Sequence, residues 1–493
     1  MKPIVLIHGY SAESDQSTAA SIAGIYGTLP RDLKAAFGAR SVVEIDLARY
    51  LSLEDGVRVD DISRALQRAL YEDFPHLLKK GFHALVHSTG ALVMRNWLRR
   101  FSARPSPLEC LVHLAGANFG SGWAHIGRGQ MAKWARQIFE HGAERGMQVL
   151  EALELGSDWT LDLHLSFLQP GSRMAEDLKV RELVIVGSQA DVKWFSFPIR
   201  YAKEDGSDGV VRVSAASLNY QYLKLGPTDD ALQLGWKKAR EQQDKHLDRR
   251  GRRQGYYEIQ EASRPGMEGR REVPLAIPYE CAHSGESMGI VTGEKPRAQV
   301  MRLLRVALGG TNLKEPGAQA AAFSSETEAT YRKVVEAQAP SWWEKWIEEP
   351  RAQYDRHAQV IFRIRDQDGR PIPDFDIFFD SSGSPKDRAR PMKDLIEDKH
   401  VNTSSPHIIT FYLRTDAFSA DTKTWIARVP EVGGCFLEIS AVEPQTSEIL
   451  YLPLRFELTA DELQAWIQGN RTTIIDVQLL RLPSPQVFTL VRG

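Results

Sequence analysis

Ser88 lies between an apolar run and a helical pattern, a position at which a serine can act as a nucleophile. Residues 84–86 are apolar, residues 87–90 read His-Ser-Thr-Gly, and residues 91–98 carry apolar side chains at helical spacing. A strand, a sharp turn and a helix would lift the hydroxyl clear of the sheet. The amide of Thr89 would then face a developing oxyanion. A plain turn with an N-capping serine fits the same residues, so the motif alone leaves both readings open.

A nucleophilic serine needs a base, and we expect His283 to supply it. Of the thirteen histidines, His283 is the one in the loop between the last predicted strand of the sheet and a closing helix. The alternative is an ordinary surface histidine. His8 and His87 stand at strand ends, where we expect them to hold loops by hydrogen bonds. Ser188 also follows a strand, but it lacks the glycine and helix that follow Ser88.

The base in turn needs a carboxylate to fix its tautomer, and Asp208 is the strongest candidate. Gly209 tightens the turn after Asp208, and residues 210–211 are valines that would anchor the turn in the core. Asp205 is the next choice and Asp191 a further rival, while a polar turn without catalytic duty is the alternative. The chain order serine, aspartate, histidine is the order found when a serine nucleophile sits at the top of a parallel sheet.

Alternating strand and helix patterns predict how these residues are positioned. Apolar runs typical of buried parallel strands occur at 4–7, 41–47, 84–86, 110–114, 182–187 and 273–278. Helical periodicity at 18–37, 62–78 and 91–98 separates them, which predicts a doubly wound, mostly parallel sheet with its site at the carboxyl ends of the strands. His8-Gly9-Tyr10 follow the first strand, and we expect the amides of Tyr10 and Thr89 to form an oxyanion hole.

The pattern divides the chain into a catalytic domain at 1–310, a helical connector at 311–352 and a β-sandwich at 353–493. Within the first, we expect a helical cap at 122–181, with helices packed on the main domain as the alternative. Residues 231–270 are a charged insertion, read as a solvated helix and loop or as a contact for anionic headgroups. The connector carries Trp342, Trp343 and Trp346, which we expect to pack between domains rather than enter a membrane interface.

Short alternating strands past position 357 predict an antiparallel sandwich. The expected strands are 359–365, 375–378, 407–413, 424–429, 435–441, 450–456, 473–480 and 487–491.

Composition excludes several classes of protein. With 62 basic and 64 acidic residues the net charge is -2, which gives no electrostatic case for nucleic acid. Cys110, Cys281 and Cys435 lack ligand-type spacing, which argues against a disulfide framework and a zinc site. No apolar run approaches the roughly 20 residues of a membrane span. Residues 1–3 lead straight into the first strand, so we expect a cytoplasmic protein without a cleaved secretory signal.

Five short motifs occur in one order along the chain. They are Ile4 to Gly9 with Tyr10, His87-Ser88-Thr89-Gly90, the set Leu114, Ala115, Asn118, Gly120 and Ser121, then Asp208 to Val211, and His283-Ser284. Together they resemble the lipase and esterase branch of the α/β-hydrolases over roughly residues 1 to 310. The sequence departs from that pattern at Val86, which stands where the family has a glycine. A lipase-like domain without a signal, followed by a β-rich domain, is similar to lipase effectors of type VI secretion systems.

The resemblance implies a serine hydrolase of carboxylic esters in which Ser88, Asp208 and His283 form the catalytic triad and no metal or cofactor is needed. The helical insertion favours an apolar acyl chain, hence a lipid or phospholipid ester. The resemblance to secreted effectors implies export by a signal-independent route, with secretion-machinery or immunity partners and contact with a membrane surface. Two alternatives stay open: a cytosolic esterase or thioesterase acting on a soluble acyl substrate, and a binding or delivery protein whose β-sandwich is the functional part.

Overall fold

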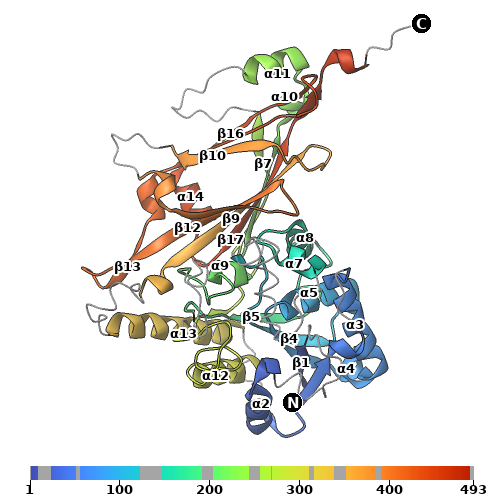
Figure 1. Ribbon diagram of the computed structural model, residues 1–493, viewed down its shortest axis with the longest axis vertical. Coiled ribbons are helices and arrows are strands. Elements are labelled where there is room, and N and C mark those ends of the chain that lie inside the picture. The colour runs from blue at the N-terminus through green and yellow to red at the C-terminus, as the bar shows by residue number, and fades with distance from the viewer. Residues whose placement is uncertain are drawn as a thin grey trace. The chain divides into compact units, whose positions relative to one another are not determined.

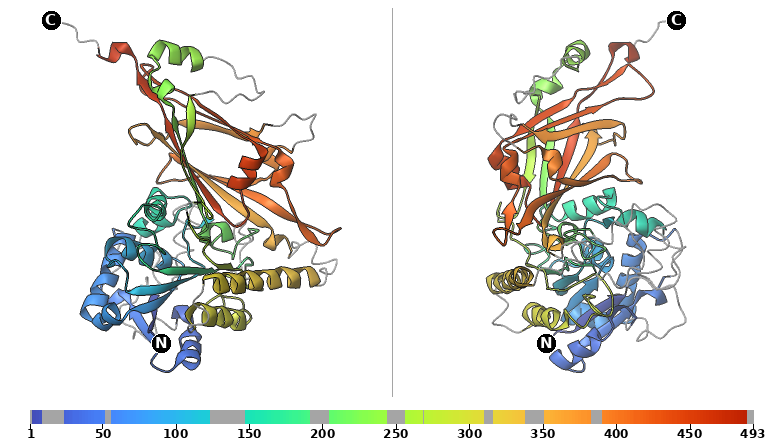
Figure 2. Two further views of the ribbon diagram at one scale, coloured as in Figure 1. Left: turned by 180° about the vertical axis from the view of Figure 1, so that it is seen from behind. Right: turned by 60° about the vertical axis from the view of Figure 1, so that its left-hand side comes forward.

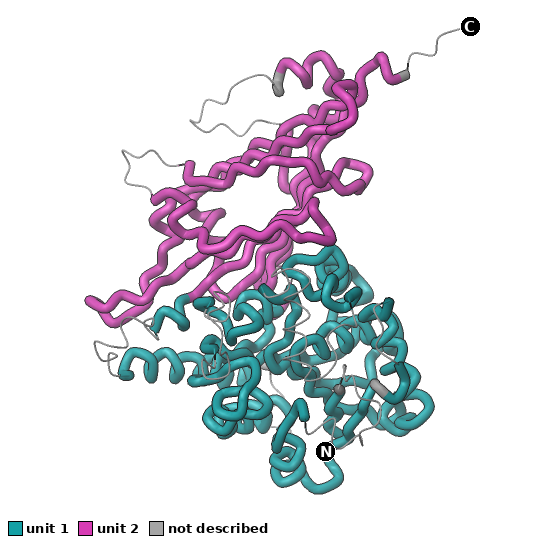
Figure 3. Tube along the Cα trace, in the orientation of Figure 1, with its two compact units in different colours: residues 1–218, 272–355 teal, residues 219–271, 356–493 magenta. Residues whose placement is uncertain are grey.

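The computed structural model describes residues 2–8, 24–51, 56–122, 147–190, 204–243, 256–267, 269–309, 316–337, 351–382 and 390–488. The chain forms two compact units, each assembled from two stretches of sequence (Figure 3). Unit 1 comprises Met1–Leu218 and Glu272–Asp355, and unit 2 comprises Asn219–Arg271 and Arg356–Gly493.

Unit 1 is built on a six-stranded parallel sheet (Figure 1). The strands run in the order β2 (Val42–Asp46), β1 (Ile4–His8), β3 (Phe82–His87), β4 (Leu108–Leu114), β5 (Arg181–Ile185) and β8 (Leu275–Ala276). Every neighbouring pair is parallel. The central strands are apolar on both faces and buried, as a parallel sheet covered on both sides requires. The doubly wound sheet expected from the sequence is therefore confirmed.

Helices cover both faces of this sheet. Their bounds are α2 (Leu29–Phe37), α3 (Val59–Glu72), α4 (Pro75–Lys80), α5 (Gly90–Arg100), α7 (Met147–Leu153), α8 (Asp158–Ser166), α9 (Val213–Ala216), α12 (Arg297–Leu308) and α13 (Pro316–Glu336), with short 3-10 turns η1 (Leu47–Arg49) and η6 (Ala352–Tyr354). Strand side chains such as Leu6, Leu85 and Leu183 share one core with α2, α12 and α13. The views in Figures 1 and 2 place α12 and α13 across the sheet from α3 and α5. Burial of each such leucine contributes about 1.5–3 kcal/mol.

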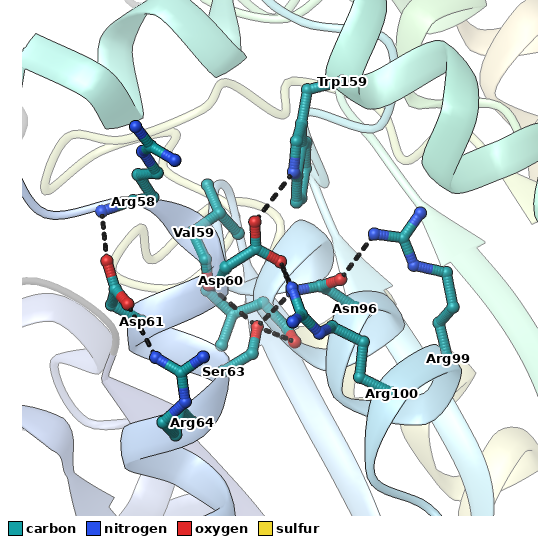
Figure 4. Close-up of polar contacts among 11 residues, drawn as sticks. Arg58, Val59, Asp60, Asp61, Ser63, Arg64, Asn96, Arg99, Arg100 and Trp159 are labelled. Carbon is teal, nitrogen blue, oxygen red and sulfur yellow. Dashed lines mark hydrogen bonds and ion pairs between the residues drawn. The ribbon is translucent and has the colours of Figure 1, made fainter.

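A polar junction ties α8 to α3 and α5 (Figure 4). The Asp60 carboxylate accepts hydrogen bonds from Asn96 Nδ2 at 2.9 Å and Trp159 Nε1 at 3.3 Å, and it pairs with Arg100. Helix α7 packs against α3 and α8. Within the expected cap at 122–181, the described helices α7 and α8 thus pack on α3 and α5 of unit 1. Residues 123–146 lie outside the described residues.

Unit 2 contains a seven-stranded sheet, a three-stranded sheet and a two-stranded ribbon. The large sheet has the order β11 (Ile396–Val401), β12 (Ile408–Ser419), β9 (Arg356–Asp366), β17 (Thr472–Leu479), β6 (Gln221–Pro227) and β7 (Tyr257–Ser263), with β13 (Thr424–Ala427) beside β12. The small sheet has the order β10 (Phe375–Ser381), β14 (Cys435–Ala441) and β16 (Leu454–Leu458), and the ribbon pairs β15 (Ile449–Tyr451) with β18 (Arg481–Pro483). The helical elements are α10 (Asp229–Leu232), α11 (Trp236–Gln243), α14 (Ala460–Trp466), η8 (Met392–Asp394), η9 (Val429–Val432) and η10 (Pro485–Phe488).

Apolar residues of the large and small sheets meet in one core, as in a sandwich. Phe362 and Phe411 of the large sheet belong to the same buried cluster as Leu437 and Phe456 of the small one. Most strand pairs are antiparallel, as expected, but β17 runs parallel to both β9 and β6. The strand expected at 487–491 is not formed in its described part, because residues 485–488 make a 3-10 turn.

The boundaries of the units differ from the expected domains in two places. Residues 219–271 belong to unit 2, because β6 pairs with β17 and β7 pairs with β6. The charged segment 231–270 is therefore not an insertion into the catalytic domain. Residues 316–355 belong to unit 1, since α13 packs on β8 and α12. The arginine-rich run at 249–253 and the tryptophans at 342–346 lie outside the described residues. Among the helices that are described, none is long and apolar enough to cross a membrane.

Candidate active site

Ser88 occupies a strained turn between β3 and α5. Its φ is +52°, in the left-handed region that costs a non-glycine residue about 1–3 kcal/mol. The turn is fixed on both sides: the Ser88 amide donates to the Leu114 carbonyl at 3.2 Å, and the Ala91 and Ala117 amides donate to the Ser88 carbonyl at 3.2 and 3.3 Å. This is the nucleophile-elbow geometry that the sequence predicts.

Val86, where the resemblance expects glycine, is accommodated within β3. It is fully buried. A Cβ added to Gly90 at the start of α5 would meet the Val86 Cβ at 3.5 Å, which is an ordinary van der Waals distance. The helix therefore approaches the strand without crowding, and the departure from the motif leaves the elbow intact.

The structure brings Ser88, His283 and Asp208 into one hydrogen-bonded chain. His283 Nε2 lies 3.1 Å from Ser88 Oγ, and His283 Nδ1 lies 3.0 Å from Asp208 Oδ2. The His283 amide also donates to the Asp208 carbonyl at 2.9 Å. Asp208 and His283 are each 1% exposed and Ser88 is 9% exposed. The carboxylate at His283 Nδ1 is therefore that of Asp208, the first choice ahead of Asp205, and Asp191 lies outside the described residues.

Backbone amides hold the Asp208 carboxylate in place. Its Oδ1 accepts from the amides of Val210 at 3.0 Å and Val211 at 2.7 Å, which leaves Oδ2 for the histidine. Gly209 permits this turn with a φ of +92°. Ser121 Oγ donates to the Val210 carbonyl at 2.5 Å and ties the loop to the segment after β4.

The segment after β4 also depends on a glycine. Gly120 has a φ of +90°, and a Cβ there would lie 2.8 Å from the Leu153 and Glu154 carbonyl oxygens. Asn118 Nδ2 donates to the Ala216 carbonyl at 2.8 Å. The Asn-x-Gly-Ser motif therefore joins the end of β4 to α7 and to the residues after the aspartate loop.

His87 lies beside His283 and contacts its backbone. Its Nε2 lies 3.2 Å from the His283 carbonyl, and the two rings are 4.8 Å apart. Burial, reinforced by repulsion from His283, lowers the pKa of His87 to about 3. A neutral His87 can donate to the carbonyl at working pH. His8 is the last residue of β1.

One of the two expected oxyanion-hole donors can be placed. Thr89 follows Ser88 directly and caps α5, where helix N–H groups carry partial positive charge. Tyr10 lies outside the described residues. No cluster of three His, Cys, Asp or Glu side chains suited to a metal ion occurs in the described part of the chain.

Unit 1 also contains two buried ion pairs that were not expected from the sequence. The Arg212 guanidinium, just past the aspartate loop, pairs with both Glu204 oxygens at 3.0 and 2.6 Å. Arg95 on α5 pairs with Glu182 on β5, which also lies 3.1 Å from His113 Nε2. Burial by itself would raise the pKa of Glu182, but Arg95 and His113 outweigh burial and lower it to about 2. A charged residue inside an apolar run was the available signal for Arg95 and Glu182.

Solved structures identify the fold. No family model and no curated protein sequence matches the chain. Phospholipase PlaB from Legionella pneumophila aligns over 100% of this chain and 96% of its own, with 22% identity and a TM-score of 0.73. The same phospholipase in complex with thio-NAD gives 22% identity and a TM-score of 0.71 over the same shares. A Bacillus licheniformis lipase covers 44% of this chain and 78% of its own at 14% identity, and its TM-score of 0.29 adds no weight. The chain therefore has an α/β-hydrolase fold extended by a β-rich second unit.

Proposed function

We propose that this protein is a serine hydrolase of carboxylic esters and that lipid or phospholipid acyl esters are its substrates. The observation that carries the proposal is the chain Asp208–His283–Ser88, with contacts of 3.0 and 3.1 Å that end on a serine held in a strained elbow. His283 lies 75 positions from Asp208 and 195 positions from Ser88 in the sequence, yet the three side chains meet in buried surroundings. Nucleophilic catalysis by serine requires such an arrangement.

The geometry supports a two-step reaction. Ser88 Oγ attacks the ester carbonyl carbon while His283 Nε2 accepts the hydroxyl proton. Asp208 stabilises the resulting imidazolium, and the amide of Thr89 donates to the oxyanion. The amide of Tyr10 stays the second donor that the sequence predicts. His283 then gives the proton to the leaving alcohol, and the acyl group stays on Ser88. Water activated by His283 hydrolyses this acyl-enzyme and regenerates the serine.

Alignment with a phospholipase over both units supports a lipid substrate. The alternative, a soluble acyl ester or thioester, differs in a measurable way. We expect hydrolysis of phospholipid in liposomes to exceed hydrolysis of short-chain soluble esters at equal ester concentration, and the reverse preference would favour the alternative. Export by a type VI secretion system stays a prediction from the sequence resemblance.

Labelling by a fluorophosphonate probe, followed by peptide mapping, tests the catalytic residues. We expect the label on Ser88 and its loss in a His283→Ala variant, because the unassisted hydroxyl is a weak nucleophile. Ser88→Ala should abolish turnover of a p-nitrophenyl ester without changing the unfolding midpoint. Retained turnover by Ser88→Ala would refute the assignment.

A further inference from the structure

The last residues of unit 1 form a buried turn that touches three loops of the candidate site. The turn is η6 (Ala352–Tyr354), and strand β9 of unit 2 starts two residues after it, at Arg356. Gln353 is 8% exposed and Tyr354 is 2% exposed. The resemblance ends near residue 310, so nothing in the motifs assigns a role to this segment.

The Gln353 carbonyl joins the loop after β5 to the loop that carries the carboxylate. It accepts from Ser188 Oγ at 2.7 Å and from the Gly206 amide at 3.0 Å. Ser188 follows β5 by three residues, and Gly206 precedes Asp208 by two. The hydroxyl of Ser188 is thus engaged in a bond that holds the turn.

The Tyr354 hydroxyl joins the same β5 loop to the loop that carries the base. It donates to Gln189 Oε1 at 3.1 Å and accepts from the Glu280 amide at 3.1 Å. Glu280 precedes His283 by three residues and has a φ of +50°, a conformation that non-glycine residues rarely adopt. The rings of Tyr279 and Tyr331 pack on Tyr354 at 6.3 and 6.4 Å, and its burial raises the pKa of its hydroxyl.

We propose that η6 is a clasp that positions the catalytic acid and base relative to each other, with Tyr354 as its main positioning residue. The proposal rests on the proposed function. Asp208 and His283 lie on separate loops, and each loop is bonded to an adjacent residue of the same turn: the acid loop to Gln353 and the base loop to Tyr354. A shift of about 1 Å between catalytic groups can cost about a hundredfold in rate, so a bond that fixes both loops acts on turnover.

The full-length Tyr354→Phe variant tests the clasp. It keeps the aromatic packing and removes only the hydroxyl that joins Gln189 to Glu280. With a soluble p-nitrophenyl ester we expect kcat to fall at least about tenfold while KM changes less than about twofold, because η6 acts through the triad. The rate of fluorophosphonate labelling should fall by the same factor as kcat. Ser188→Ala removes the other side-chain bond to the clasp and should also lower kcat.

Tyr257→Phe is the matched control. Tyr257 is also a buried tyrosine whose hydroxyl joins two segments, the Leu452 carbonyl at 2.6 Å and the Leu480 amide at 3.2 Å, but it belongs to unit 2. We expect both variants to lower the unfolding midpoint and only Tyr354→Phe to lower kcat.

Two outcomes would overturn the clasp: a kcat for Tyr354→Phe within twofold of wild type, or equal losses of kcat in Tyr354→Phe and Tyr257→Phe. Either outcome would leave the assignment of the catalytic triad unaffected, provided that Ser88→Ala is inactive. An active Ser88→Ala would instead refute the proposed function.

Discussion

The Asp208 carboxylate bonds to His283 Nδ1, so its charge should govern turnover. Asp208→Asn should lower kcat by about 10³–10⁴-fold, because an amide no longer fixes the tautomer of His283 or stabilises its cation. The backbone bonds to Oδ1 should survive in the amide, so the fold should be kept. Steady-state turnover of a p-nitrophenyl ester measures the effect. Asp205→Asn is the control, and it should retain more than a third of the activity. A larger loss in Asp205→Asn than in Asp208→Asn would contradict the assignment.

The buried side chain of His87 should make the stability of the protein depend on pH. Burial lowers the pKa of His87 from the ordinary 6.5 to about 3. Between these two pH values His87 is therefore protonated in the unfolded chain and neutral in the folded chain. Stability should therefore fall as the pH drops below 6.5, by about 2 kcal/mol between pH 7 and pH 5 from this group. Urea unfolding at the two pH values measures the change. His87→Gln keeps a donor for the His283 carbonyl but does not titrate, and it should reduce the pH dependence by that amount. An unchanged pH dependence would show that His87 does not act in this way.

Local residue patterns predicted these positions well, because the chemistry of the site is recorded in short motifs. Ser88 precedes a glycine and a helix, Asp208 precedes a glycine and two valines, and His283 follows the last strand. Tyr354 and Arg212 could not be found in this way. Tyr354 bonds to Glu280, 74 positions away, and no neighbouring residue marks that contact.

At the scale of elements, the loop that carries His283 depends on its close approach to the end of β5. A Cβ added to Gly187 would lie 1.9 Å from the Cys281 carbonyl oxygen. Gly187→Ala should therefore displace this loop, destabilise the protein by about 1–3 kcal/mol and slow labelling by a fluorophosphonate. Urea unfolding and labelling rates measure the two effects.

Gly317→Ala is the matched control for this prediction. Gly317 lies on α13 in the same unit, and a Cβ there would meet nothing within 4 Å. The Gly317→Ala variant should have the same stability and the same labelling rate as the wild type. If Gly187→Ala behaved like this control, the close approach would have no bearing on the site.

Pairing between distant elements is what the sequence could not reveal. Strand β6 has the apolar alternation of any strand, and the chain that leads into it, up to Leu218, belongs to unit 1. It joins unit 2 only because it pairs with β17, some 250 residues later, in parallel register from Gln221 beside Thr473 to Leu225 beside Val477. Periodicity reports which residues are buried and carries no information about which strand lies beside them.

At the scale of the whole molecule, the two units cannot be separated by a single cut, because unit 2 is built from two stretches of chain. A chain ending at 355 would keep β6 and β7 without the rest of their sheet. An isolated two-stranded hairpin is marginal in water, and its unpaired edge would invite association. We expect such a chain to aggregate. Co-expression of residues 356–493 as a second chain should restore solubility, since β17 can then pair with β6.

A variant of the shortened chain separates pairing from other causes of insolubility. Leu223 and Leu225 of β6 lie in the core of unit 2, 1% and 2% exposed. Replacing both by Asp makes that face of the hairpin polar, so the shortened chain should become more soluble and should no longer capture residues 356–493. Soluble yield and co-purification measure the two effects. If the unaltered chain ending at 355 were soluble, monomeric and as stable as the full chain, unit 2 would not need its first stretch, and the division of the molecule into these two units would be wrong.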